Sequence, residues 1–204
     1  MSFLARLKKQ SVIVAAVALW IPAVAFGITV MWRYSTTPGR PATPPLNWPA
    51  RVPVERAEGQ ATLVMFVHPQ CPCTSASLGE LAIILAHAQG KLDADLFFYL
   101  PVSETAAWAK TDLWRNAGAI PGVRVFLDPE AAMARSFGVF TSGQTLLYDS
   151  RGRLLFKGGI TAFRGHSGDN AGRSAISALL QGGPSVQSIL PVVTPVLGCS
   201  LRGE

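Results

Sequence analysis

The stretch Ala61–Glu80, with the sequence ATLVMFVHPQCPCTSASLGE, constrains the fold more than any other part of the chain. Its apolar run Thr62–Val67 is short and rich in β-branched and aromatic side chains, which indicates a strand buried on both faces. Apolar residues then recur at helical spacing until about Gly90, so a helix follows directly. Cys71 and Cys73 lie at the junction. A strand-turn-helix unit is therefore predicted to present two thiols at its turn.

The N-terminal residues 11–32, SVIVAAVALWIPAVAFGITVMW, carry no charge and match the length of about 20 residues that crosses a bilayer. Basic residues precede this run, which predicts that residues 1–10 stay in the cytoplasm and that the remaining chain is exported. The expected location is a bacterial inner membrane, with a single transmembrane helix and the domain in the periplasm. The rival interpretation is a cleaved signal peptide, because Ala23–Ala25 resembles a small-residue cleavage site. The apolar run continues past that point to Trp32, as an anchor requires.

Composition divides the rest of the chain into three parts. Residues 33–54 are rich in proline and have no apolar periodicity, which predicts an extended linker. Residues 55–183 are enough for one domain with its own core. Residues 184–204 form a tail that contains further prolines and is predicted to be irregular, although its apolar side chains favour packing on the domain or on the membrane surface.

Strands and helices alternate along the domain, and this order predicts a parallel sheet covered by helices. An Asp-Pro pair then marks a helix start, with Asp128 as the cap and Pro129 at the first helical position. Two strands separated by a turn of Ser, Gly and Arg end the alternation as a hairpin, which makes the sheet mixed. The expected strands are 62–67, 92–100, 123–127, 145–149 and 154–158, and the expected helices run from about Cys73 to 89 and over 104–117, 128–137 and 170–181.

The order of elements and the position of the cysteines resemble the thioredoxin superfamily over residues 55–181. The segment Phe66–Cys73 is similar to that family's first strand and Cys-x-x-Cys motif, with one residue fewer between the cysteines. The phrase His-Pro-x-Cys-Pro-Cys-Thr, with Thr141–Gly143 and a Gly-His pair at His166 downstream, resembles a little-characterised bacterial group called RedB. The resemblance implies a thioredoxin-like mixed sheet flanked by helices. It also implies a thiol-disulfide oxidoreductase that acts on protein thiols or disulfides in the extracytoplasmic space.

Two departures from the thioredoxin pattern affect the site. The family places a cis-proline before the fourth strand, and the matching position here is Gly143, so we expect an altered grip on substrate. The Cys71-Pro72-Cys73 spacing is the second departure, because residues two apart bridge only with distortion and Pro72 restricts the backbone further. A strained bridge is reduced more easily than a structural disulfide, which favours a redox role.

The expected roles of the thiols follow from their positions. Cys71 is expected to attack and Cys73 to resolve. A helix that begins near Cys73 would activate the thiolate through its unpaired N–H groups, whereas a capping box at Ser77 would leave both sulfurs in the loop. Cys199 is the odd cysteine and is either a further resolving thiol or a free or intermolecular thiol on the tail.

Histidines and one arginine are candidates for the rim of the site. His68 follows the first strand and either tunes a thiolate or caps the turn. The loop 159–170 is expected at the same edge of the sheet as the cysteines, which would bring Arg164 and His166 to the rim.

No cofactor is expected for the redox function. The alternative function is copper(I) delivery, as in the Sco proteins that the anchored form resembles, with Cys71, Cys73 and His166 as ligands. A third possibility is a noncatalytic interaction module. The net charge of +6 is scattered along the chain, and the sequence contains neither a phosphate loop nor a dinucleotide fingerprint. Nucleic-acid binding is therefore not expected.

Overall fold

The structure is a computed structural model that describes residues 2–50, 52–56, 59–182 and 190–202. It divides into two compact units, Met1–Thr37 and Pro38–Glu204, which are described separately. The first unit is one helix, α1 (Ser2–Thr36), which contains Pro22. Its part Gln10–Thr36 is long and apolar enough to cross a membrane, a property that signal sequences near an N-terminus share. The predicted apolar helix is therefore present.

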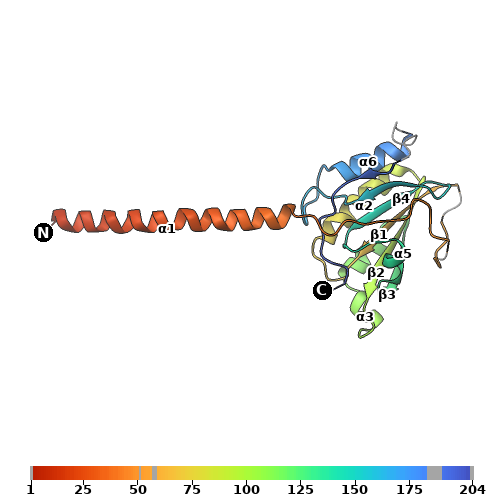
Figure 1. Ribbon diagram of the computed structural model, residues 1–204, viewed down its shortest axis with the longest axis horizontal. Coiled ribbons are helices and arrows are strands. Elements are labelled where there is room, and N and C mark those ends of the chain that lie inside the picture. The colour runs from red at the N-terminus through yellow and green to blue at the C-terminus, as the bar shows by residue number, and fades with distance from the viewer. Residues whose placement is uncertain (1, 51, 57–58, 183–189, 203–204) are drawn as a thin grey trace. The chain divides into compact units, whose positions relative to one another are not determined.

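The second unit is built on a six-stranded mixed sheet with the order β3-β2-β1-β4-β5-β6 (Figure 1). The first three strands are mutually parallel, β4 is antiparallel to β1 and β5, and β6 is parallel to β5. The strands are β1 (Ala61–Val67), β2 (Leu92–Leu100), β3 (Val123–Pro129), β4 (Gln144–Tyr148), β5 (Leu154–Gly158) and β6 (Val192–Val193). This arrangement matches the predicted alternation followed by a hairpin.

Helices cover both faces of the sheet, and a separate apolar core lies under each layer. The helices are α2 (Thr74–Ala88), α3 (Ala106–Ala109), α4 (Asp112–Gly118), α5 (Ala132–Ser136) and α6 (Ala171–Leu180). Leu63, Met65 and Val67 of β1 pack in the core beneath α2 and α6, whereas Val64 and Phe66 pack in the core that includes α5. β1 is therefore buried on both faces, as its apolar run predicts. The fold class, a thioredoxin-like mixed sheet flanked by helices, is confirmed.

Two helix predictions need correction. The helix predicted over 104–117 is broken into α3 and α4, because Thr111 takes an extended conformation and its hydroxyl donates to the carbonyl of Pro69, 3.0 Å away. The helix predicted to begin at Pro129 begins at Ala132 instead. Asp128 does cap it, since its carboxylate accepts from the amides of Met133 and Ala134. The intervening backbone is left-handed at Glu130 and Ala131, with φ of 52° and 55°, so it cannot be helical.

Segments at both ends of this unit lie on the sheet. From Pro38 onward the proline-rich segment belongs to the second unit. Within it Ala42 is buried, and the ring of Trp48 packs edge-on against Phe137 and Tyr148. The tail contributes β6 and three buried apolar residues, Val196, Leu197 and Leu201. Residues 184–189 of the predicted tail lie outside the described residues. The described part of the tail is therefore packed against the domain, one of the two environments expected for it.

Candidate functional site

The turn after β1 fixes the positions of Cys71 and Cys73. The amide of Cys71 donates to the carbonyl of His68 at 3.0 Å, and the amide of Thr74 donates to that of Cys71 at 3.1 Å. Helix α2 begins at Thr74, so Cys73 is its N-cap residue. The predicted helix start near Cys73 is confirmed, and the alternative start at Ser77 is wrong. Both cysteines are buried, with exposed fractions of 1% and 8%.

The tail brings a third thiol to this turn. The Sγ atoms of Cys71 and Cys199 lie 3.1 Å apart, and the three sulfurs all lie within 4.8 Å of one another. The carbonyl of Cys199 accepts from the amide of Ser142 at 2.8 Å. Gly198 allows this approach, because a Cβ at its position would lie 1.9 Å from the carbonyl oxygen of Ser142. Cys199 therefore lies in the thiol cluster, where all three cysteines are free thiols.

Ser142 bonds to three parts of the site, namely the tail at Cys199, the turn at His68 and the start of α2 at Thr74. Its hydroxyl accepts from the amide of His68 at 2.9 Å and lies 2.9 Å from the hydroxyl of Thr74. The next residue, Gly143, has a positive φ of 83°, and its amide donates to the carbonyl of Phe66 at 2.8 Å. Sequence reasoning placed Gly143 opposite the cysteines but did not identify the contributions of Ser142 and Thr74. Their position beside Gly143 and Cys73 was the only available signal.

The three thiols differ in their electrostatics. Burial raises the pKa of Cys71, but hydrogen bonds from Cys199 and Thr74 outweigh burial, so that this pKa lies below the ordinary value of a thiol. Burial and the charge of Cys71 raise the pKa of Cys73, against the attraction of Arg164. Burial and the hydrogen bond to Cys71 raise the pKa of Cys199 to about 12. Cys71 is therefore the thiol that ionises first.

His68 lies beside the turn rather than in the sulfur cluster. Its ring packs between Tyr99 and Trp108, and its Nδ1 accepts from the amide of Gln70 at 3.2 Å. Burial lowers the pKa of His68, which favours the neutral ring that can accept this bond. The contacts of His68 are those of a residue that caps the turn.

The loop between β5 and α6 lies at the rim, as predicted. A Cβ at Gly165 would lie 3.8 Å from the Cα of Cys73, and Arg164 Nη1 donates to the carbonyl of Gly198 at 2.6 Å. His166 is exposed, and its Nδ1 lies 2.8 Å from the carbonyl oxygen of Arg164. Among the described residues, the cluster of side chains able to bind a metal here consists of the three cysteines and includes no histidine.

A buried carboxylate holds that loop against α2. Glu80 accepts from the amide of Gly168 at 2.7 Å, from Asn170 Nδ2 at 3.1 Å and from Arg173 Nη1 at 2.6 Å. Glu80 is fully buried, so these bonds compensate for the loss of its hydration. The rim loop, and through Arg164 the tail, are thus anchored to the same helix that begins at the cysteines.

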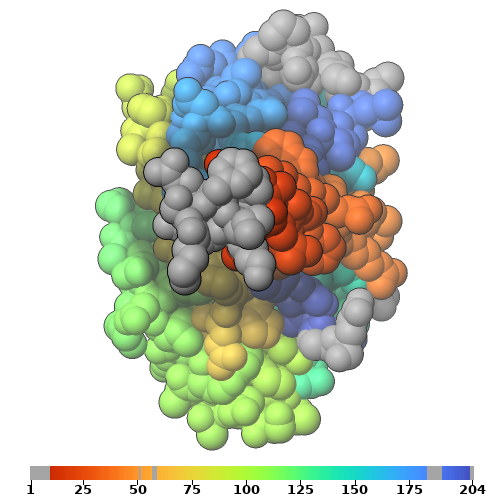
Figure 2. Space-filling model, turned by 90° about the vertical axis from the view of Figure 1, so that its left-hand side faces the viewer, coloured from red at the N-terminus to blue at the C-terminus, as the bar shows by residue number. Residues whose placement is uncertain are grey.

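An open groove is lined in part by Cys71. Its walls come from the turn and from the start of α4, including Pro69, Pro72, Thr111 and Leu113. In the space-filling view, the orange-yellow atoms near residue 70 reach the surface beside the light-green segment around residues 100–110 (Figure 2). Pro72 is exposed there. The groove gives a partner molecule a surface next to Cys71.

Comparisons with known proteins identify the fold but no family. No family model and no curated protein matches the chain. A hypothetical protein from Sinorhizobium meliloti superposes with a TM-score of 0.54 at 23% identity, over 82% of this chain and 96% of that one. An uncharacterized conserved protein from Geobacillus kaustophilus superposes with a TM-score of 0.56 at 17% identity, over 83% and 95% of the two chains. The exposed lipoprotein thioredoxin of Streptococcus pneumoniae has a TM-score of 0.45, with 18% identity over 61% and 86%.

The strand order and the site together define the class of this domain. It has a thioredoxin-like fold, a mixed sheet flanked by helices, in which the turn between β1 and α2 carries two of three clustered thiols. The third thiol comes from the C-terminal segment and lies more than a hundred positions away along the chain.

Proposed function

We propose that the chain is a membrane-anchored, extracytoplasmic thiol-disulfide oxidoreductase whose attacking residue is Cys71. The observation that carries this proposal is the cluster of three thiols at a strand-helix turn, in which the pKa of one thiol is lowered and those of its two neighbours are raised. The thiolate is the nucleophile in disulfide exchange, so a cluster in which one member ionises first supports an ordered reaction. The narrower resemblance to the RedB-type group is part of the same proposal.

The reaction has two balanced steps. The Cys71 thiolate attacks one sulfur of a substrate disulfide, forms a mixed disulfide and releases the other substrate sulfur as a thiolate, which takes up a proton. A second thiol of the chain then loses its proton, attacks the Cys71 sulfur and displaces the remaining substrate thiolate. The substrate disulfide is reduced to two thiols while two thiols of the chain are oxidised to a disulfide. The reverse sequence oxidises a substrate dithiol.

Cys199 is better placed than Cys73 for the second step. The Cys199 sulfur already contacts the Cys71 sulfur at 3.1 Å. A Cys71–Cys199 disulfide also avoids the strained ring that a Cys71–Cys73 disulfide would close across Pro72. Cys73, the resolving residue expected from the sequence, remains in reach as a third thiol.

The decisive test uses the purified full-length chain in a nonionic detergent. The reduced chain is incubated with a peptide disulfide, and its thiols are counted and mapped by mass spectrometry. We expect reversible loss of two thiols and a mixed disulfide on Cys71. If the wild-type chain forms neither, the redox proposal is wrong. A biological activity that survives replacement of Cys71 and Cys73 by serine would instead favour the noncatalytic interaction module.

The location is proposed from α1 and is tested in cells. A membrane-impermeant thiol reagent applied to intact spheroplasts should label Cys199 if the domain lies outside the inner membrane. Labelling that requires lysis would contradict this topology. The intact mass of the purified chain distinguishes an uncleaved anchor from a signal peptide cut after Ala25.

Copper(I) binding is a second candidate function, favoured by the three sulfurs within 4.8 Å of one another. Thiolates are soft ligands and suit copper(I), and three of them complete a trigonal site. In this proposal Cys199 takes the position that the sequence suggested for His166. We expect stoichiometric copper(I) binding that weakens in Cys199→Ser and is retained in His166→Ala. Equal binding by wild type and Cys199→Ser would exclude the three-thiol site.

A further inference from the structure

A cavity of about 660 Å³ opens beside Cys199, within the range of small-molecule sites. Its wall contains four arginines from four separate segments: Arg40 of the proline-rich segment, Arg135 of α5, Arg164 of the rim loop and Arg202 of the tail. No carboxylate belongs to the described residues that line it. The thiol cluster thus has a strongly basic cavity on one side and the open groove at Cys71 on the other.

The hydrogen bonds and the ring contact made by the side chains of Arg40, Arg135 and Arg202 are to uncharged groups. The guanidinium of Arg40 lies 3.8 Å from the centre of the Phe140 ring. Arg202 Nη2 donates to the carbonyl of Glu130 at 2.8 Å, and Arg135 donates to the same oxygen. Carbonyls and rings carry no net charge. Among the ion pairs of the described residues, none involves Arg40, Arg135 or Arg202.

Two carboxylates lie behind this cavity, and both are already bonded to backbone amides. Asp128 interacts electrostatically with Arg202, but it is buried and its two oxygens accept from Met133 and Ala134. The Glu130 carboxylate accepts from the amide of Val102. A ligand in the cavity therefore meets guanidinium groups and no competing acid in the lining. Guanidinium groups bind carboxylates in pairs of parallel hydrogen bonds.

We propose that the cavity binds a low-molecular-weight thiol that carries carboxylates and directs its sulfur to a Cys71–Cys199 disulfide. This inference rests on the redox function proposed above and names the reductant class. The thiolate of the bound molecule attacks the Cys199 sulfur, forms a mixed disulfide there and releases Cys71 as a thiolate. A second molecule attacks the mixed disulfide and releases Cys199. Two small thiols are oxidised to one disulfide, and their two protons reach the two cysteines.

The positions of the sulfurs favour this direction of attack. Cys199 belongs to the cavity wall, so it is the sulfur that an occupant meets. Protein substrates and the small thiol would then approach from different sides, the first through the groove at Cys71 and the second through the arginine cavity.

The test uses three thiols that differ in the charge of the group joined to the sulfur through two methylenes: 3-mercaptopropionate, 2-mercaptoethanol and cysteamine. Each reduces the oxidised full-length chain in nonionic detergent at low ionic strength. The measured quantity is the ratio of the rate constants for the anionic and the neutral thiol. Replacing Arg40, Arg135 and Arg202 together by Gln should lower this ratio about tenfold, which is equivalent to about 1.4 kcal/mol lost from exposed charge pairs. Added salt should lower it in wild type.

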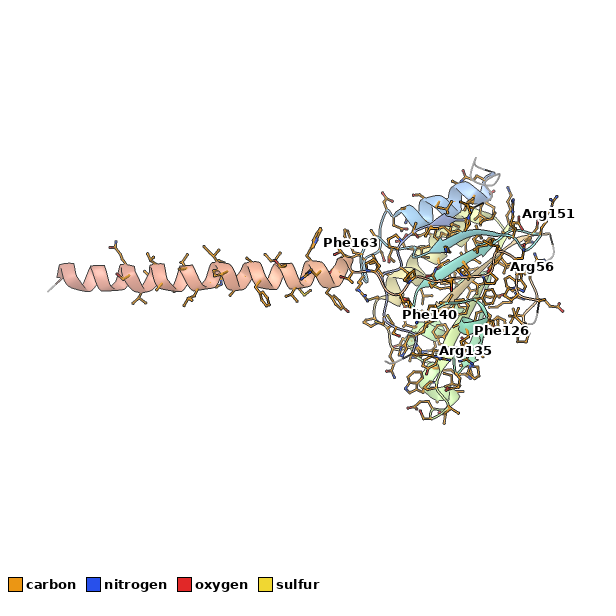
Figure 3. The ribbon with its side chains drawn as sticks, viewed as in Figure 1. Arg56, Phe126, Arg135, Phe140, Arg151 and Phe163 are labelled. Atoms are coloured by element: carbon orange, nitrogen blue, oxygen red, sulfur yellow. The ribbon has the colours of Figure 1, made fainter. Side chains whose placement is uncertain are left out.

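Arg151→Gln is the matched control. It removes the same kind of charge from an exposed turn, and Figure 3 shows Arg151 at a distant edge of the domain from Arg135 and Phe140. Its ratio should stay within about twofold of wild type. If the triple variant fails to fold, Arg40→Gln alone decides the question, because Arg40 is exposed and its guanidinium stacks on the Phe140 ring. An unchanged ratio in the folded variant, with all three thiols still active, overturns the inference and leaves the redox function intact.

A binding measurement separates the two proposals. S-methylglutathione carries two carboxylates and cannot exchange disulfides, so its binding by wild type and the triple variant is followed by NMR. Wild-type binding that the triple variant loses supports the carboxylate site, and if no thiol then reduces the chain, the redox function and the sulfur transfer are refuted while the binding site stands. Absence of binding in wild type overturns the inference. Binding of phosphatidylglycerol, but not of S-methylglutathione, through the same arginines assigns the cavity to lipid headgroups and also overturns it.

Discussion

The turn that carries Cys71 and Cys73 and the tail that carries Cys199 reach one cluster of sulfurs by different physical means. The turn is held by bonds between near neighbours, such as the amide of Cys71 to the carbonyl of His68, and in addition by Ser142 and Thr111. The tail is held by Ser142 and Arg164, which are far from it in sequence. The turn thus has local bonds of its own, whereas the described bonds that place Cys199 come from distant segments. This difference suggests that the tail is the adjustable half of the site.

The largest expected effect separates the chemical roles of the two halves. Cys199→Ser should trap a stoichiometric mixed disulfide between Cys71 and a peptide, because the remaining thiol of Cys73 can resolve it only through a strained bridge across Pro72. Resolution should slow by at least about a hundredfold. Cys71→Ser should form no mixed disulfide. Mass spectrometry of acid-quenched samples measures both. Accumulation of the mixed disulfide in Cys73→Ser, and not in Cys199→Ser, would show that Cys73 is the resolving residue.

The second prediction concerns Glu80, the buried carboxylate that holds the rim loop against α2. Glu80→Gln should lower the free energy of unfolding by about 3 kcal/mol, because it leaves Arg173 without its buried partner. Asp169→Asn is the matched control, since Asp169 pairs with the same arginine but is fully exposed, so no measurable change is expected. Thermal unfolding of the full-length chain in detergent compares the two. Equal effects would show that the buried bond does not hold the rim loop.

The third prediction loosens the tail alone. Gly198→Ala places a Cβ against the carbonyl oxygen of Ser142. Because this oxygen belongs to the backbone and cannot rotate away, the free energy of unfolding should fall by about 1–3 kcal/mol. Alkylation of Cys199 should become faster as the tail is displaced. Gly118→Ala is the control, because its Cβ would meet only a side-chain atom of Val125 at 3.8 Å. Unchanged alkylation in Gly198→Ala would mean that the close approach does not fix Cys199.

The locally determined half of the site could be predicted from the sequence. The apolar run before His68 and the helical spacing after Cys73 give the strand-turn-helix unit without reference to the rest of the chain. The mixed sheet followed from the alternation of such units and the final hairpin. One helix prediction failed because a distant contact overrides the local pattern, since Thr111 bonds to Pro69 and breaks the helix. The other failed for a local reason, because Glu130 and Ala131 take a left-handed backbone and delay the helix start after Asp128.

The tail half could not be predicted, because its prolines and short apolar runs indicate no regular element. Its place depends on the fit of Gly198 against Ser142 and on the Arg164 bond, which are properties of the assembled sheet. A glycine directly before an unpaired cysteine was the available signal. The basic cavity was missed for the same reason, since its four arginines are scattered along the chain and meet only in the fold.

The smallest expected effect tests whether Cys199 in the tail lowers the pKa of Cys71 in the turn. The pKa of Cys71 is lowered because the hydrogen bonds to its thiolate outweigh burial, so it is ionised at a lower pH than an ordinary thiol. Removing one donor in Cys199→Ala should shift this pKa upward, and the pH profile of attack on a peptide disulfide should move to higher pH. Cys73→Ala should move it upward by less, because it removes a thiol that hydrogen-bonds to Cys71 but keeps the backbone bond from residue 73 and the Cys199 donor. Thiolate absorbance at 240 nm gives the same titration independently of access. A profile that does not move in Cys199→Ala would mean that the turn alone sets the reactivity of Cys71, and that the tail supplies a resolving thiol without activating the attacking one.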